Sequence, residues 1–135
     1  MLKKILSLVS SSLAAIPIVL PIILSIIILI FRGKIVYDFL MPAELFPFTL
    51  AGALSMIILG SISQKRVKKL IVLLVLSLLN LVISQVYANF SGLAHGESSI
   101  RDHLFMVVMF IFFYHLFALL IMLECFSLTK EIWQE

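Results

Sequence analysis

The stretch QKRVKK, at residues 64–69, separates two long apolar runs and carries four of the ten basic residues of the chain. No other internal segment of the sequence is as polar and as uniformly charged. Short basic connections between hydrophobic runs are typical of the cytoplasmic side of membrane proteins. The stretch therefore predicts a cytoplasmic hinge between two membrane-spanning helices, and it orients the segments on both sides. Its topology-determining residues are Lys65, Arg66, Lys68 and Lys69.

The composition supports a membrane location. Of the 135 residues, 63% are hydrophobic and 13% are charged, whereas soluble domains average about 45–50% apolar and about 25% charged residues. A soluble globule of this size could not hide so much apolar surface, because a small chain has too much surface for its volume. The net charge of +3 is small and concentrated at the hinge, so we expect the lipid bilayer, and no nucleic acid, as a partner.

Four apolar runs predict transmembrane helices. They cover residues 5–31, 45–63, 70–90 and 104–123. The first run resembles a signal peptide at its start, but it continues far beyond the small residues Ala14 and Ala15, so we expect it to be retained. The sequence thus predicts an all-α polytopic membrane protein. Its single domain holds four transmembrane helices in an up-down-up-down bundle.

The first run should be bent and should present small residues to its neighbours. Pro17 and Pro21 each remove a backbone donor, so we expect a bend near residues 13–17. One helical face carries a stripe of small residues, namely Ser7, Ser11, Ala14, Pro21 and Ser25. Such a stripe lets another helix approach closely. A packing seam is the simpler interpretation of this face, and a gating hinge is the alternative.

Polar side chains inside the last two runs are the candidate functional residues. They are Ser77, Asn80, Ser84, Tyr114 and His115. Lipid cannot satisfy an amide or an imidazole, so Asn80 and His115 should face the bundle, and Asn80 should bond to another helix. By depth, Asn80 or Ser84 is the expected partner of His115. His115 could serve packing alone, or a ligand or proton role. Haem ligation would need a second axial histidine, which no other run contains, and we expect no cofactor.

The connector after the third run holds the chain's other chemically versatile cluster: His95, Glu97, Asp102 and His103. These residue types can bind zinc, but their spacing matches no recognised metal motif, so they are weak candidates for a metal site. Phosphate-loop, GxSxG and HExxH motifs are absent from the sequence, and we expect no enzymatic activity. We expect Glu124 to pair with the hinge lysines at the start of a short polar tail. Cys125, the only cysteine, excludes an internal disulfide, and we expect it to be buried or lipid-facing, with palmitoylation as the alternative.

The basic residues predict the topology. With the hinge inside, seven are cytoplasmic, namely Lys3, Lys4, Lys65, Arg66, Lys68, Lys69 and Lys130, and three are outside, namely Arg32, Lys34 and Arg101. This asymmetry predicts that both termini are cytoplasmic. A bacterial inner membrane is the expected location.

Two function classes fit the sequence. The first is a non-catalytic membrane protein that acts through helix–helix contacts with itself or with another membrane protein, as an accessory, assembly or immunity-type protein. The second is a small transporter or channel, possibly an oligomer, that uses the polar stripe of residues 70–90 and His115. The absence of charged residues from the middle of the runs favours the first class.

Overall fold

The computed structural model describes residues 1–34, 37, 41–93, 96 and 100–134, and every regular element among them is a helix. In chain order these elements are α1 (Leu2–Arg32), α2 (Met41–Glu44), α3 (Phe46–Ile62), α4 (Lys68–Phe90), the 3₁₀ turn η2 (Ile100–His103) and α5 (Leu104–Trp133). Three helical stretches are long and apolar enough to cross a membrane, and they correspond to α1, α4 and α5 with part of η2. α3 is the shorter apolar helix, with 17 residues. The described chain is therefore all-α, with three long apolar helices and one shorter one, as expected for a small polytopic membrane protein.

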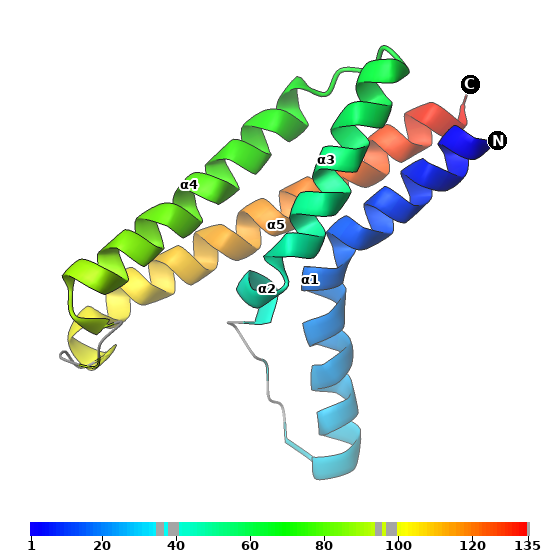
Figure 1. Cartoon of the computed structure of the whole chain (residues 1–135). Coiled ribbons are helices and arrows are strands. Elements are labelled where there is room, and N and C mark those ends of the chain that lie inside the picture. Colours follow the sequence, from blue (N-terminus) through cyan, green and yellow to red (C-terminus); the bar gives the residue numbers. More distant parts are fainter. Residues whose placement is uncertain (35–36, 38–40, 94–95, 97–99, 135) are drawn as a thin grey trace.

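α5 is the helix on which the others assemble (Figure 1). α4 lies antiparallel to its first two thirds, from the Tyr87–His103 contact to the Lys69–Glu124 contact. α1 packs on the remainder, with Ser11 against Thr129. α5 is 30 residues long, about 45 Å at 1.5 Å per residue, which lets one helix serve two partners in succession. α3 completes the core by packing against α1 and, less extensively, against α5.

The continuation of α5 overturns the predicted polar tail. The helix does not end near residue 123 but runs to Trp133. Its last three turns bury Cys125, Leu128, Thr129 and Ile132. These residues continue the helical spacing of the apolar face, and the charged residues Glu124, Lys130 and Glu131 occupy the other faces. The segment is therefore an amphipathic end of α5, with a buried face that α1 covers.

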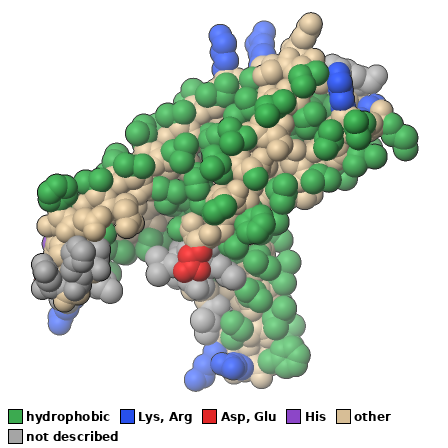
Figure 2. All heavy atoms as spheres, in the orientation of Figure 1, with side chains coloured by type: hydrophobic (Ala, Val, Ile, Leu, Met, Phe, Trp, Pro, Cys, Tyr) green, Lys and Arg blue, Asp and Glu red, His purple; other side chains and the backbone are tan. Residues whose placement is uncertain are grey.

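α1 consists of a packed half and an extended half. Its buried residues all lie between Ser7 and Pro21, and beyond Pro21 no residue of the helix is buried. Figure 1 shows that the helix changes direction along its length, as the two prolines lead one to expect, and that its C-terminal half diverges from α4 and α5. We call residues 22–32 the α1 arm. Figure 2 shows hydrophobic side chains along this arm and Lys and Arg side chains at its tip.

The small-residue stripe of α1 is buried over most of its length. Ser7, Ser11 and Ala14 are fully buried, but Ser25, on the arm, is only half-buried and donates a hydrogen bond to its own helix at Pro21 O, at 2.7 Å. The buried part of the stripe therefore lies in the packed half of α1, whereas the arm that carries Ser25 diverges from α4 and α5.

α3 crosses α1 at Gly52. A Cβ atom at this position would lie 2.5 Å from Ser10 O and 2.6 Å from Ala14 N. Both neighbours are backbone atoms, so only glycine allows the two helices to approach this closely. The neighbouring residues Ala53 and Met56 of α3 are fully buried.

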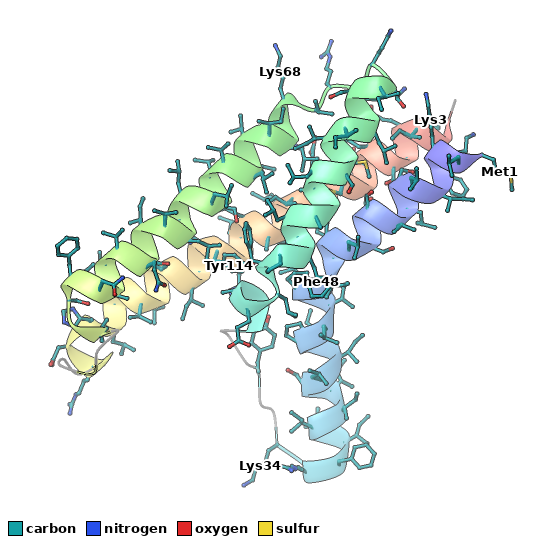
Figure 3. All side chains as sticks on the ribbon, viewed as in Figure 1. Met1, Lys3, Lys34, Phe48, Lys68 and Tyr114 are labelled. Carbon is teal, nitrogen blue, oxygen red and sulfur yellow. The ribbon has the colours of Figure 1, made fainter. Side chains whose placement is uncertain are left out.

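The basic hinge is a tight connection, as predicted. α3 ends in a pair of hydrogen bonds, from Lys65 N to Gly60 O at 2.8 Å and from Gln64 N to Ser61 O at 3.1 Å. Gln64 adopts a left-handed conformation with φ of 54°. This is the Schellman geometry that terminates many helices. α4 begins at Lys68, and Figure 3 shows that Lys68 and Lys3 lie at one end of the molecule and Lys34 lies at another.

Candidate functional site

The polar side chains of α4 lie along its contact with α5. Asn80 donates a hydrogen bond from Nδ2 to Phe110 O at 3.2 Å. The cross-helix bond expected for Asn80 is therefore present, and its acceptor is a backbone carbonyl. Ser84 instead donates to Leu81 O of its own helix at 2.8 Å. Ser77 is fully buried, and its Oγ makes no hydrogen bond within the part of the chain that the structure describes.

A cavity of about 210 Å³ adjoins these residues between α4, α5 and α2. Its polar lining comes from Asn80, Ser84, Gln85, Tyr87 and Tyr114, and the remainder of the lining is apolar. The cavity is smaller than the roughly 300–1,000 Å³ of typical small-molecule sites. It could hold a few water molecules or a very small solute. We call it the α4–α5 cavity.

Two tyrosines lie at this cavity. Tyr87 OH lies 2.7 Å from His103 Nδ1 and its ring meets the imidazole edge-on, which ties the end of α4 to the start of α5. Tyr114, labelled in Figure 3, is buried. It packs edge-on against Phe46 of α3, with ring centroids 6.1 Å apart. Tyr114 is thus part of the core where α3, α4 and α5 meet.

His115 was predicted to bond to Asn80 or Ser84 of α4. The hydrogen bond that the structure gives it has a different partner. Its Nδ1 lies 2.8 Å from Ile111 O, one turn earlier in α5. Because a carbonyl oxygen can only accept, Nδ1 carries the proton of this bond. The helix backbone therefore accepts the Nδ1 proton, a bond that we expected from Asn80 or Ser84, whereas the buried Nε2 makes no hydrogen bond within the described residues. Asn80 bonds instead to Phe110 O, the residue before Ile111.

A second hollow, of about 660 Å³, lies between His115 and the connector that follows α1. Tyr37, Val108, Ile111, Phe112 and His115 line it. The Tyr37 ring is 6.0 Å from the His115 ring, centroid to centroid. Nothing in the sequence pattern indicates that Tyr37 lies against α5.

Only two of the four weak candidates for a metal site fall within the residues that the structure describes. His95 and Glu97 lie outside the described residues. Asp102 and His103 are both in η2, and His103 bonds to Tyr87. Within the described ranges, no three His, Cys, Asp or Glu side chains are placed to share a metal ion.

The expected ion pair between Glu124 and the hinge is present. Lys69 Nζ lies 2.7 Å from Glu124 Oε2. The Lys69 side chain is 70% exposed and that of Glu124 only 15%, so the pair joins the start of α4 to α5 at the rim of the bundle. Exposed pairs of this kind contribute little free energy.

Comparisons with known proteins do not assign the chain to a family, so its class follows from the fold alone. The chain matches no protein-family model, no curated protein and no solved structure. The fold and the polar contacts define a small helical protein whose long apolar helices indicate an integral membrane location.

Proposed function

We propose that the protein acts through contacts between its helices and those of a membrane partner, as an accessory, assembly or immunity-type protein without catalytic activity. The observation that carries this proposal is the α1 arm. Seven of its large hydrophobic side chains are exposed, from 42% at Ile27 to 82% at Phe31. The small-residue stripe of α1 continues past the buried Pro21 to Ser25 in the arm, and Ser25 is only half-buried. A small-residue face allows close packing of a further helix.

The proposed orientation places the hinge and both termini in the cytoplasm, with the helices in up-down-up-down order in a bacterial inner membrane. Two features support it. The N-terminus, the C-terminus and the connection between α3 and α4 gather at one end of the molecule in Figure 1. Seven of the ten basic residues belong to these segments, as the positive-inside rule requires of a cytoplasmic side.

A crosslinking experiment tests the proposed helix contact. A photoreactive amino acid replaces Ser25 in the full chain in native membranes, and the matched control carries it at Val82, a 57% exposed position on α4. We expect irradiation to give one discrete adduct from position 25, either a doubled chain or the chain joined to one membrane protein. The control should give only lipid adducts. Lipid adducts alone from positions 22, 25 and 26 would contradict the proposal.

A second candidate is a small transporter or channel, and the α4–α5 cavity favours it. Five polar side chains line the cavity, and the buried Ser77 Oγ has no hydrogen-bond partner within the described ranges. A transported solute or a water file would need such groups. The two candidates differ in whether this region is wet, and the absence of charged residues from the middle of the predicted spans supports the dry alternative.

A further inference from the structure

The hinge and the last turns of α5 enclose a hollow of about 850 Å³ at the end of the molecule that carries both termini. We call it the basic hollow. Its lining residues are Lys65, Arg66, Val67, Lys68, Lys69, Glu124 and Glu131. Four are cationic and two are anionic. The four cationic residues are close together in the sequence. The opposite side of the hollow is formed by Glu124 and Glu131, because α5 continues beyond residue 123.

The excess positive charge of the hollow is exposed. Lys69 and Glu124 neutralise each other at 2.7 Å. Arg66 and Lys68 are both exposed, and Figure 2 shows Lys and Arg side chains at this end of the molecule. A guanidinium and an ammonium group lining one hollow can both bind phosphate oxygens. The charge of the hollow therefore favours an anion, such as a phosphate group.

The surface next to the hollow is apolar. Ile71 and Val72 follow Lys68 by three and four residues, so they share its face of α4. They are 41% and 56% exposed, and Ile62, at the end of α3, is 60% exposed. A free phosphate would use only the cationic part of this surface. A ligand with an anionic head and hydrocarbon tails would use both parts.

We propose that the basic hollow binds the phosphate headgroup of an anionic phospholipid, with its acyl chains along Ile62, Ile71 and Val72. Cationic side chains near a membrane surface attract anionic lipids, and the attraction weakens as salt increases. α3 ends and α4 begins at the rim of the hollow. In the proposed orientation the hollow therefore lies at the level of the lipid headgroups. This inference depends on the membrane location of the helices and not on the helix-contact function proposed above.

Native mass spectrometry of the purified full chain tests the proposal. The protein is equilibrated in mixed micelles with equal mole fractions of phosphatidylglycerol and phosphatidylcholine. We expect retained adducts of phosphatidylglycerol over phosphatidylcholine. The double variant Arg66→Gln/Lys68→Gln should lose phosphatidylglycerol affinity by roughly tenfold to thirtyfold, the loss expected for two charges near a membrane surface. The control variant Lys34→Gln/Arg101→Gln removes two charges outside the hollow and should retain wild-type binding.

A further variant keeps the test decisive if the double variant does not fold. Glu131→Gln removes a carboxylate from the lining and should strengthen phosphatidylglycerol binding. Three outcomes would overturn the proposal: equal retention of both lipids, equal loss in the control variant, or no gain with Glu131→Gln. Competition of millimolar inorganic phosphate with the lipid, at constant ionic strength, would overturn it in favour of a site for a free anion.

Discussion

The hydroxyl oxygens of Ser11 and Thr129 lie 2.6 Å apart in a buried contact between α1 and α5, although 118 positions separate the two residues. Thr129 Oγ1 also donates to Ser7 O at 3.1 Å. Since a hydroxyl has one proton, Ser11 must be the donor in the first bond. One turn further along, Trp133 Nε1 donates to Lys4 O at 3.1 Å and Lys4 Nζ donates to Trp133 O at 3.0 Å. These bonds fasten the start of α1 to the end of α5.

Thr129→Val should destabilise the protein by about 1 kcal/mol. The substitution keeps the side-chain shape but removes a donor to Ser7 O and leaves the Ser11 hydroxyl without its acceptor. Interhelical hydrogen bonds in membranes average about 0.6 kcal/mol, and a buried partner left unsatisfied adds to this loss. Thermal unfolding in detergent measures the change. Ser25→Ala is the control, because that hydroxyl bonds within its own helix on the arm, and an equal effect of both substitutions would contradict the assignment.

The paired ends of α1 and α5 could not be predicted from the sequence. Glu124, Lys130 and Glu131 give the last twelve residues the composition of a polar tail. Cys125, Leu128 and Ile132 follow helical spacing, which is recognisable once the fold is known. The same spacing can occur in a polar segment that follows a membrane span and packs against nothing, so it did not predict the contact with α1. Thr129 finds its partners only because α1 reaches back along α5. The apolar runs themselves are long and continuous, and hydropathy was sufficient to predict them.

Gly52→Ala should destabilise the contact between α1 and α3 by about 1–3 kcal/mol, the usual range for overpacking. The added Cβ would lie within 2.6 Å of two α1 backbone atoms, so the helices must separate to accept it. Ala51→Val adds bulk on the exposed side of the same helix and is the control. A shift in the unfolding temperature of detergent-solubilised protein should occur for the first substitution only. Similar shifts for both would mean that the crossing is not close-packed.

Gln64→Gly should stabilise the protein by about 1 kcal/mol. Gln64 has a φ of 54° at the end of α3, and a left-handed conformation costs a residue with a side chain about 1–2 kcal/mol, which glycine avoids. Ser63→Gly is the matched control because Ser63 has a φ of −90°, where glycine only raises the entropy of the unfolded chain. The prediction is an increase in unfolding temperature for the first variant and a decrease for the second. The reverse order would reject the Schellman geometry of the hinge.

Topology reporters test the proposed orientation. Fusions after Gln64 and Glu135 should report the cytoplasm, and fusions near Tyr37 and Gly96 should report the outside. Neutralising the four basic residues of the hinge leaves three basic residues on each side, so the variant should insert in mixed orientations. An external location of the C-terminus would show that the number of spans is wrong.

The position of the candidate site and the cross-helix bond of Asn80 were predictable, but the bonding partners were not. Spacing alone places Ser77, Asn80 and Ser84 on one face of α4, and that face does adjoin α5. The partners depend on the axial register of the two helices, which the hydrophobic pattern does not specify to within one turn. Asn80 therefore reaches Phe110 O, and His115 bonds to Ile111 O of its own helix. Gln85 and Tyr37 line the two hollows without any signal in the sequence.

Thiol labelling decides between the dry and the wet interpretation of the α4–α5 contact. We expect Ser84→Cys and His115→Cys, each in a Cys125→Ser background, to resist a membrane-impermeant thiol reagent in intact and in inverted vesicles. The reagent reacts with the thiolate, which forms only where water reaches the side chain. Gln64→Cys in the same background is the control, because this exposed hinge residue should react from the cytoplasmic side. Rapid labelling from either side, at position 84 in the α4–α5 cavity or at position 115 in the second hollow, would reject the dry interior and favour the transporter.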